Sequence, residues 1–482
     1  MRASRGAMDG GQVVVLLGLL GFAAALRIIV WQLYPSIHWP DEVMQATEQG
    51  HRLVFGYGVK PWEWFIGIRS WFLPGLLAGP QYLAAWFDAG PDLYLPLIHG
   101  GLALVSLTVP FVAFRLGGRE DGMAFALVAA APSALWFELV YFAPRALTEV
   151  VAAHLMILGL YLLMTHADRP WRLFSAGLLL GVAAMTRPQI GPAMLVGSLI
   201  AIGWPRWTWL PFIGGALVGL LTLGLLDWGT WDYPFQSAWL HFRIALVDGR
   251  FYGGDSPPWN LFISEIIRHW GGALAILLLL VGLGTRGYVP LLAVAVVHIA
   301  VHSSLPYKEF RYIYPALPCL MILAGIGLAR AIVLARRHIP PEGVRIAWLA
   351  TAVSSAALAV QPGFSDEWRR GAAVMEAYDA LSRHPKLCGV ALIDNPISTT
   401  PGFSHLHRRV PLYEGTAADL PTLSGYADAL VTPLKSVPGY DLLRCWESPG
   451  TALGPERNCV HVRSGDCAPG PDPGWGMHPP AR

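Results

Sequence analysis

Two groups of residues in this sequence carry side chains that could act together in a chemical reaction. Asp41 and Glu42 lie side by side near the beginning of the chain, and Lys308, Glu309 and Arg311 lie close together far downstream. A carboxylate can remove a proton from a hydroxyl group. A guanidinium and an ammonium match the oxygens of a phosphate. The two groups therefore suggest proton transfer and anion binding.

The first group stands in a segment, His38 to Pro74, that interrupts the apolar first half of the chain with charged and aromatic residues. Pro40 suits the first turn of a helix, where Asp41 and Glu42 would be stabilised by free N–H groups and the helix dipole. If this helix continues, one face carries Asp41, Gln45, Glu48 and Arg52. The alternative is an amphipathic helix that lies on a membrane surface.

The second group has an alternative interpretation too, because Lys308 and Arg311 could simply anchor two helix ends at the membrane surface. Two further charged features stand near apolar segments. Arg145 and Glu149 are four residues apart, and this spacing predicts that they pair with each other. Arg187 is embedded in apolar sequence and is a candidate functional residue, with charge compensation inside the bundle as the alternative.

Aromatic and polar residues of the loops could contact a sugar or another acceptor, since aromatic rings suit the apolar side of a sugar ring. The same rings suit the lipid headgroup region, so this signal is weak by itself. Our candidates for sugar or acceptor binding are His51, Trp62, Glu63, Arg69, Arg145, Tyr252 and Trp259.

The composition requires these residues to be carried by a polytopic membrane protein. Of the 482 residues, 54% are hydrophobic and only 14% are charged, and the mean hydropathy is +0.46. The net charge is close to neutral, and nothing in it indicates nucleic acid. Apolar stretches predict about eleven transmembrane helices, at residues 13–33, 92–114, 122–142, 146–164, 172–186, 190–204, 207–226, 268–284, 287–303, 312–334 and 344–361.

The arginines of the short loops, such as Arg115, Arg119 and Arg169, fall on one side of the membrane if there are eleven spans, and that side should be cytosolic together with the N-terminus. Two larger loops, residues 34–91 and 227–267, then face the opposite side with everything that follows the last span. Both groups of candidate residues are thus expected in one compartment.

Residues 363–467 have the composition of a small α/β soluble domain, with a predicted amphipathic helix followed by short strands. Four cysteines lie there, at positions 388, 445, 459 and 467, and they allow three disulfide pairings. Cys319 is alone in a span. Residues 468–482, rich in Pro and Gly, are expected to form a disordered tail.

The sequence resembles glycosyltransferase family 22, the mannosyltransferases that use polyprenyl- or dolichyl-phosphate-mannose and include enzymes of GPI-anchor synthesis. The resemblance is carried by ordered blocks between residues 27 and 335: PDEVMQATEQGHRLVFGYG, WEWFIGIRSWFLP, RALTEV, TRPQ, FYGGDSPPW and KEFRYIYPALP. Trp39 and Tyr307 stand where the family usually has His, Tyr312 replaces its Phe, and Pro61 replaces a common Thr.

The resemblance implies the GT-C fold for residues 1–362, an all-α bundle with the small α/β domain appended. It also implies that Asp41, with Glu42 beside it, is the essential acidic residue of the catalytic site, and that Lys308, Glu309 and Arg311 bind the donor phosphate. The expected reaction is inverting transfer of mannose from a polyprenyl phosphate to a hydroxyl of a glycan or glycolipid at the outer or lumenal face. We find no Asp-x-Asp pair or His cluster, so no metal or other cofactor is expected.

Two alternatives remain open from the sequence. The first keeps the fold but uses another lipid-linked sugar or a protein acceptor. The second is a different class of protein, a lipid or sugar transporter or flippase, although such proteins usually place their essential charges near the bilayer midplane. The membrane would be the plasma membrane of a bacterium or the endoplasmic reticulum membrane of a eukaryote.

Overall fold

The computed structural model describes residues 8–166, 169–203, 207–244, 257–450, 454–463 and 473. The described chain is mostly helical and divides into two compact units. Unit 1 comprises Met1–Val30, Gly100–Pro144 and Thr148–Phe364, and unit 2 comprises Trp31–His99, Arg145–Leu147 and Ser365–Arg482. The first loop, residues 34–91, therefore belongs to the same compact unit as the C-terminal domain, although the two are far apart in the sequence. The predicted tail, residues 468–482, lies outside the described residues apart from position 473.

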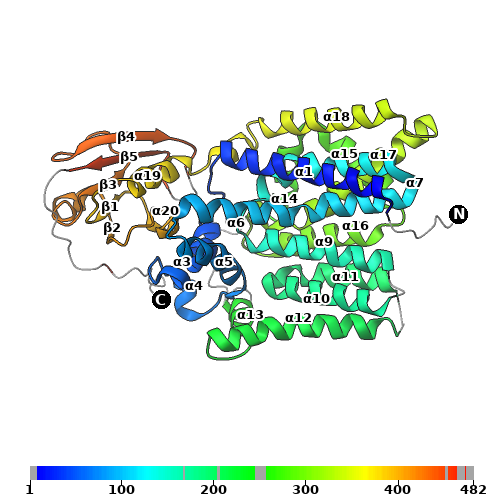
Figure 1. Ribbon diagram of the computed structural model, residues 1–482, viewed down its shortest axis with the longest axis horizontal. Coiled ribbons are helices and arrows are strands. Elements are labelled where there is room, and N and C mark those ends of the chain that lie inside the picture. Colours follow the sequence, from blue (N-terminus) through cyan, green and yellow to red (C-terminus); the bar gives the residue numbers. More distant parts are fainter. Residues whose placement is uncertain are drawn as a thin grey trace. The chain divides into compact units, whose positions relative to one another are not determined.

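Unit 1 is a bundle of helices that run roughly parallel or antiparallel to one another (Figure 1). Helices α1 and α6 each cross a boundary between the units. The helices are α1 (Gly10–Leu33), α6 (Pro91–Ser106), α7 (Thr108–Leu135), α8 (Phe137–Phe142), α9 (Thr148–His166), α10 (Pro170–Thr186), α11 (Gly191–Ile202), α12 (Trp209–Thr230), α13 (Gln236–Phe242), α14 (Leu261–Trp270), α15 (Leu274–Thr285), α16 (Val289–Ser304), α17 (Ala316–Arg336) and α18 (Pro341–Ala359), with 3-10 turns at Pro188–Ile190, Gly271–Ala273 and Phe310–Ile313.

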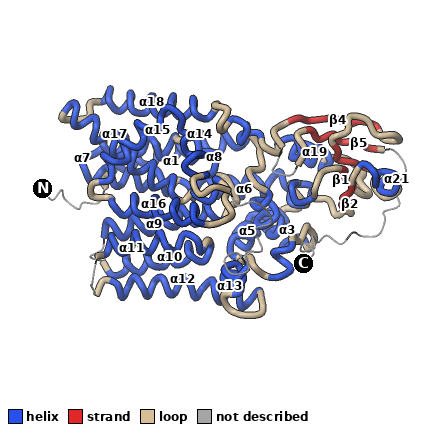
Figure 2. Tube along the Cα trace, turned by 180° about the vertical axis from the view of Figure 1, so that it is seen from behind, coloured by secondary structure: helices blue, strands red, loops and turns tan. Residues whose placement is uncertain are grey.

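Close helix contacts in unit 1 depend on small residues. Gly177 and Gly181 of α10 face α12, where a Cβ on Gly177 would collide with the carbonyl of Phe212. On α12, a Cβ on Gly215 would collide in the same way with the carbonyl of Phe174. Each helix thus presents small residues four positions apart to the other, which allows two backbones to approach closely in a membrane. The two helices lie side by side in Figures 1 and 2.

Six helical stretches in the described part of the chain are long and apolar enough to cross a membrane. They are Gly10–Leu33, Pro91–Leu135, Thr148–Thr165, Trp209–Thr230, Leu261–Thr285 and Ala316–Arg336. Pro188–Ile202 and Val289–Ser304 are apolar but shorter. Helix α7 is broken at Asp121 and Gly122, whose backbone is not helical, so the long second stretch bends back on itself there. These findings agree with an integral, multi-pass membrane protein.

Arg27 shows how the first span carries a charge inside an apolar helix. Its side chain is completely buried, and its guanidinium donates to the carbonyls of Ser133 and Ala134 near the end of α7. These carbonyls have no partner within their own helix, so the guanidinium completes their hydrogen bonding.

Unit 2 contains a five-stranded sheet in the order β2-β1-β3-β5-β4 (Figure 1). Strand β1 is parallel to β2 and β3, whereas β5 is antiparallel to β3 and β4. The elements of this unit are α2 (Pro40–Glu42), a π-helical turn (Val43–Thr47), α3 (Glu48–Phe55), α4 (Trp62–Ile66), α5 (Phe72–Trp86), a 3-10 turn (Ser365–Arg369), α19 (Ala372–Ser382), β1 (Val390–Ile393), a 3-10 turn (Ile397–Thr399), α20 (Phe403–Leu406), β2 (Leu412–Gly415), a 3-10 turn (Ala417–Asp419), α21 (Leu420–Leu423), β3 (Ala429–Thr432), β4 (Asp441–Glu447) and β5 (Arg457–Val462).

The helix and strands predicted for the C-terminal part of the chain are present, and α19 packs against one face of this sheet. Alternate residues of β1 enter two separate cores, with Val390 and Leu392 on one face and Ala391 and Ile393 on the other. The first of these cores also contains residues of the first loop, namely Ile37, Val43, Met44 and Val59. The sheet and the loop that carries the candidate acids therefore share one hydrophobic core.

A disulfide between Cys445 and Cys459 joins the neighbouring strands β4 and β5. Cys388 is also disulfide-bonded, whereas Cys319 is a buried free thiol. The fourth cysteine of the domain, Cys467, lies outside the described residues.

Candidate functional site

The helix predicted to begin at Pro40 is present and contains a π-helical turn. Trp39 is extended and Pro40 occupies the first helical position, so Asp41 and Glu42 lie in the first turn as expected. The π-helical turn, Val43–Thr47, follows directly and leads into α3. Such turns are rare and are frequent at functional sites. Asp41 remains partly exposed, whereas Glu42 is buried.

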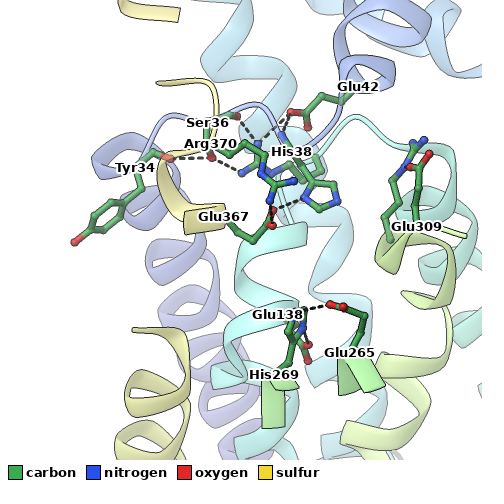
Figure 3. A network of polar contacts seen from close by, with 12 residues as sticks. Tyr34, Ser36, His38, Glu42, Glu138, Glu265, His269, Glu309, Glu367 and Arg370 are labelled. Carbon is green, nitrogen blue, oxygen red and sulfur yellow. Dashed lines mark hydrogen bonds and ion pairs between the residues drawn. The ribbon is translucent and has the colours of Figure 1, made fainter. Parts of the chain in front are cut away.

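Glu42 is held in place by two contacts within unit 2. Its Oε1 accepts the backbone N–H of His38 at 2.7 Å and lies 3.2 Å from Nη1 of Arg145. Arg145 also donates through Nη1 to the Ser36 carbonyl and through Nη2 to the Ser36 hydroxyl at 2.5 Å. Figure 3 shows Glu42, His38 and Ser36 in this network. These contacts fix the loop immediately before Asp41.

The same network is connected to the segment that precedes α19. The imidazole of His38 contacts Glu367 at 3.0 Å through Nδ1, and Glu367 forms an ion pair with Arg370 at 2.5 Å (Figure 3). The backbone N–H of Ile37 donates to the carbonyl of Arg370 at 2.9 Å. The loop before Asp41 is therefore held by side-chain and backbone contacts within unit 2.

A second carboxyl group lies close to Asp41. Gln45 donates to Oε1 of Glu63 at 3.0 Å, and Arg69 forms an ion pair with the same oxygen at 3.6 Å. Burial raises the pKa of Glu63, the nearby charge of Asp41 raises it further, and Arg69 opposes both effects. The structure thus brings together Asp41, Glu63 and Arg69, which were singled out separately from the sequence. The neighbouring candidate Trp62 is half-buried at the start of α4.

Glu48 differs from the expectation that it shares a helix face with Asp41. It is fully buried, and its carboxylate accepts the backbone N–H groups of Val59, Phe403 and Ser404 at 2.7, 3.1 and 2.7 Å. Burial raises its pKa, although these hydrogen bonds lower it in part. The wider π-helical turn lies between Asp41 and Glu48, so the spacing of a regular helix does not apply. Glu48 connects the first loop to α20 and has a structural role.

His51, a predicted sugar-binding candidate, is also completely buried. Its Nδ1 lies 3.0 Å from the carbonyl of Tyr57 and its Nε2 lies 3.1 Å from Nδ1 of His407. Burial, with the charge of His407 as a smaller cause, lowers the pKa of His51 to about 3. Both ring nitrogens are therefore engaged inside unit 2, and this position favours a structural role.

The predicted phosphate-binding residues belong to a buried cluster of charges in unit 1. Glu149, at the start of α9, is 1% exposed, and its Oε1 lies 3.1 Å from Nη2 of Arg187 and 3.4 Å from Nη1 of Arg311. Two guanidinium groups therefore share one carboxylate oxygen. Arg187 reaches this position because the chain breaks between α10 and α11 at Arg187 and Pro188.

Tyr312 and Glu309 complete this cluster. The guanidinium carbons of Arg187 and Arg311 lie 4.7 and 5.0 Å from the centre of the Tyr312 ring. Glu309 accepts from Nε of Arg311 at 2.5 Å and from the Tyr312 hydroxyl at 3.1 Å. Cations over an aromatic face are attracted by its quadrupole. Tyr312 thus orients both guanidinium groups.

Lys308 lies at the edge of the same segment. Its Nζ donates to the carbonyls of Pro257 and Leu305 at 3.1 and 2.5 Å, and its side chain is buried. The ammonium is therefore held by backbone carbonyls of the loop before α14 and of the end of α16. This contact ties the second loop to the Lys308 segment.

The pairing of Arg145 with Glu149 predicted from their spacing is wrong. Arg145 pairs with Glu42 in unit 2, and Glu149 pairs with Arg187 and Arg311 in unit 1. The backbone from Ala143 to Leu147 is not helical, so the two residues are not one helical turn apart.

The second loop is described only in part. Trp259 is 70% exposed at the start of the turn before α14, and Tyr252 lies outside the described residues. Helix α14, which follows this loop, is joined to α8 through Glu138. Glu138 accepts from the indoles of Trp136 and Trp270 at 3.0 and 2.9 Å and contacts His269 at 3.0 Å. Figure 3 shows the Glu138–His269 contact, which fastens α8 to α14.

One polar residue of unit 1 was not found by sequence reasoning. His302 is 2% exposed at the end of α16, and its ring centre lies 6.2 Å from that of Tyr312. In the sequence it follows an apolar helical run, where a histidine has no distinguishing signal. A polar residue near the end of a span, four positions after His298, was the available indication.

The fold and the sequence agree with known glycosyltransferases. The structure is similar to that of ArnT from Cupriavidus metallidurans, crystallised bound to undecaprenyl phosphate, with a TM-score of 0.60, 15% identity and coverage of 96% of this chain and 100% of that one. At this identity the likeness concerns the fold alone, which is of the GT-C type.

The chain belongs to the Alg9-like mannosyltransferase family, whose sequence signature matches residues 19–407. GPI mannosyltransferase 3 of Yarrowia lipolytica is 27% identical over 405 residues, which are 81% of this chain and 75% of that protein. GPI alpha-1,2-mannosyltransferase 3 of Homo sapiens is 26% identical over 88% of this chain and 76% of its own length. The resemblance seen in the motifs is confirmed, and the protein is a mannosyltransferase with a multi-pass membrane domain.

Proposed function

We propose that the protein transfers a mannosyl group from a polyprenyl or dolichyl-type phosphate to a hydroxyl of a glycan or glycolipid, with inversion at the anomeric carbon. The family and the names of its relatives, GPI mannosyltransferases, support this reaction. The lipid tail of the donor can remain in the bilayer beside a multi-pass membrane protein. The polar sugar acceptor can be bound by the loops and the sheet domain.

The observation that carries the proposal is the cluster of buried cationic side chains in unit 1. Arg187 and Arg311 share the carboxylate oxygen of Glu149, and Lys308 lies in the same segment as Arg311. Guanidinium groups bind phosphate through parallel N–H donors, so this cluster is suited to hold the phosphate of the donor.

In the proposed reaction the bond between the anomeric carbon and the phosphate oxygen breaks, and its electron pair goes to that oxygen. Arg311 and Arg187 stabilise the negative charge that develops there, while Lys308 orders the neighbouring loops. The acceptor oxygen forms the new bond to the anomeric carbon and loses its proton to Asp41. General-base assistance of this kind contributes roughly 10²- to 10⁴-fold.

Asp41 serves as the base, since it is partly exposed in the first turn of its helix, whereas Glu42 is buried and engaged with Arg145. Glu63 and Arg69 lie in the same cluster and would contact the acceptor, together with Trp62. We propose that no metal ion takes part, because the lipid monophosphate that leaves carries limited charge and cationic side chains can balance it.

We further propose eleven transmembrane helices, with α10, α11, α16 and α18 counted as spans beside the six long apolar stretches and with Pro91–Leu135 counted as two spans. The N-terminus is then cytosolic, and the first loop and the sheet domain face the outer or lumenal side of a plasma membrane or endoplasmic reticulum membrane. This orientation follows from the arginines of the short loops.

The experiment is transfer of labelled mannose from polyprenyl-phosphate-mannose by the purified full chain in detergent. Asp41→Asn should bind the donor but lose nearly all transfer, because the amide cannot take the proton. Asp92→Asn, which changes an exposed acid of the same unit, is the matched control and should transfer normally. Transfer by Asp41→Asn at the rate of the unaltered enzyme would remove Asp41 from the mechanism.

The cationic cluster is tested in the same assay. Arg311→Ala should mainly raise the donor KM, since it removes a phosphate ligand. Unchanged donor kinetics would return Arg311 to a purely structural role.

A further inference from the structure

The hydrogen bonds of His302 define what its second ring nitrogen can do. Its Nδ1 lies 3.0 Å from the carbonyl of His298, one turn earlier in α16. A carbonyl only accepts hydrogen bonds, so Nδ1 carries the proton. In the neutral imidazole, the form that predominates near neutral pH for an ordinary histidine, Nε2 is then an acceptor.

This acceptor is buried and has no hydrogen-bond partner among the described residues. His302 is 2% exposed, and its Nε2 is enclosed by protein. Each buried polar atom without a partner calls for an explanation, such as a bound water, ion or ligand. The nitrogen therefore requires a donor group from outside the described chain.

Arg187 lies beside the ring of Tyr312, as His302 does, and has a hydrogen-bond donor without a partner among the described residues. Its guanidinium lies 4.7 Å from the centre of the Tyr312 ring, and the His302 ring lies 6.2 Å from it. Arg187 is 8% exposed, and its Nε–H is buried without a partner in the part of the chain that the structure describes. One unmatched donor and one unmatched acceptor thus share Tyr312 as a neighbour.

We infer that Arg187 binds the phosphate of the donor and that His302 accepts a hydrogen bond from a hydroxyl of the donor sugar. This inference rests on the proposed function. The Arg187 Nε–H donates to a phosphate oxygen. A phosphodiester has no proton to give, so the group that donates to His302 Nε2 is a hydroxyl of the sugar attached to that phosphate.

This assignment makes His302 a specificity residue for the sugar rather than a phosphate ligand. A site built to hydrogen-bond a hydroxyl rejects an analogue that lacks it, because the protein group is then left unpaired. Arg187 would act on any lipid phosphate, with or without a sugar. The two residues can therefore be separated by experiment.

The test uses donors from which single mannosyl hydroxyls have been removed. Binding of polyprenyl-phosphate-mannose and each deoxy analogue is measured by competition against labelled polyprenyl phosphate, and transfer is measured in parallel. The unaltered enzyme should bind one deoxy analogue about 10-fold or more weakly than the full donor. His302→Ala should bind the two equally, and His302→Gln, which retains an acceptor, should discriminate between them in part.

Binding of sugar-free polyprenyl phosphate should depend on Arg187 and not on His302. Its binding should be weakened by Arg187→Lys, which keeps the charge beside Glu149 but lacks the Nε–H. It should be unchanged in His302→Ala and in the control His338→Ala, which alters an exposed histidine.

Failure of this inference is distinguishable from failure of the proposed function. If the unaltered enzyme distinguishes no deoxy analogue, or if His302→Ala and His302→Gln distinguish it as well as the unaltered enzyme does, a water molecule satisfies Nε2 and the inference is wrong. If binding follows the expected pattern but mannose is not transferred, the inference stands and the proposed reaction is wrong. If neither the donor nor sugar-free polyprenyl phosphate binds, both are wrong.

Discussion

The ion pair between Glu42 and Arg145 offers a quantitative test of how the loop before Asp41 is held. Both side chains are buried, and Arg145 Nη1 lies 3.2 Å from Glu42 Oε1. Replacing Arg145 with Met removes the cation and leaves the Glu42 carboxylate buried with the His38 N–H as a remaining donor. Loss of one partner of a buried pair costs about 3–5 kcal/mol.

Replacing the acidic partner of this pair should lower the free energy of unfolding by less. In Glu42→Gln the amide oxygen can still accept from His38 and Arg145, and Arg145 keeps its bonds to Ser36, so we expect a loss of about 1–2 kcal/mol. If the two effects were independent, the double variant would lose their sum. Because the amide needs no counter-charge, the double variant should lose no more than Arg145→Met alone, which corresponds to a coupling of about 1–3 kcal/mol.

The assay combines unfolding of the purified full chain in detergent with transfer of labelled mannose. Arg145→Met should reduce kcat roughly 100-fold, because Asp41 follows the loop directly and small displacements of a catalytic group are costly. The double variant should recover part of this loss. The control is the exposed pair of Asp379, on α19, and Arg383, directly after it, 2.6 Å apart, whose coupling should not exceed about 0.5 kcal/mol. Additive effects at Glu42 and Arg145, or full turnover in Arg145→Met, would refute the reasoning.

Three further predictions concern unit 2 and the absence of a metal requirement. Burial lowers the pKa of His51 from its ordinary value near 6.5 to about 3 in the folded state, so the unfolded chain binds the proton first as the pH falls. The contribution of His51 to the free energy of unfolding is therefore fully present above about pH 6.5. It declines at lower pH and is smaller by about 2 kcal/mol at about pH 5. Acid unfolding curves of His51→Asn should therefore be flatter, and a curve of equal slope would contradict the assignment. Glu48→Gln turns an N–H donor toward backbone N–H groups and should lower stability by about 2–4 kcal/mol in denaturant unfolding, so an unchanged midpoint would remove Glu48 from this structural role. Transfer should continue in excess EDTA, and activity that disappears and returns with Mg²⁺ or Mn²⁺ would show that a metal takes part.

Local signals in the sequence were sufficient for several elements of the protein. Pro40 followed by two acids predicted the helix start, and the apolar stretches located the long spans. The change of composition near residue 363 predicted the α/β domain with its helix and strands. These features depend on neighbouring residues, because backbone preference, helix capping and hydropathy act over one or two turns.

The order of charged blocks along the chain also predicted which family the protein belongs to and that Lys308, Glu309 and Arg311 form part of a charged group. It did not reveal which charges meet. The spacing of Arg145 and Glu149 predicted a pair, yet each has partners more than thirty residues away in the sequence. Likewise, the buried role of Glu48 depends on backbone N–H groups of α20, more than three hundred residues later.

The sequence by itself therefore determined the kinds of element, the membrane character and the class of chemistry. The tertiary structure alone decided the partners of the buried charges, the inclusion of the first loop in the core of the sheet domain, and the position of His302 beside Tyr312. The physical reason is that burial and ion pairing depend on distances in space. A charge buried by the fold must be compensated by whatever group the packing brings within about 4 Å, regardless of its place in the chain.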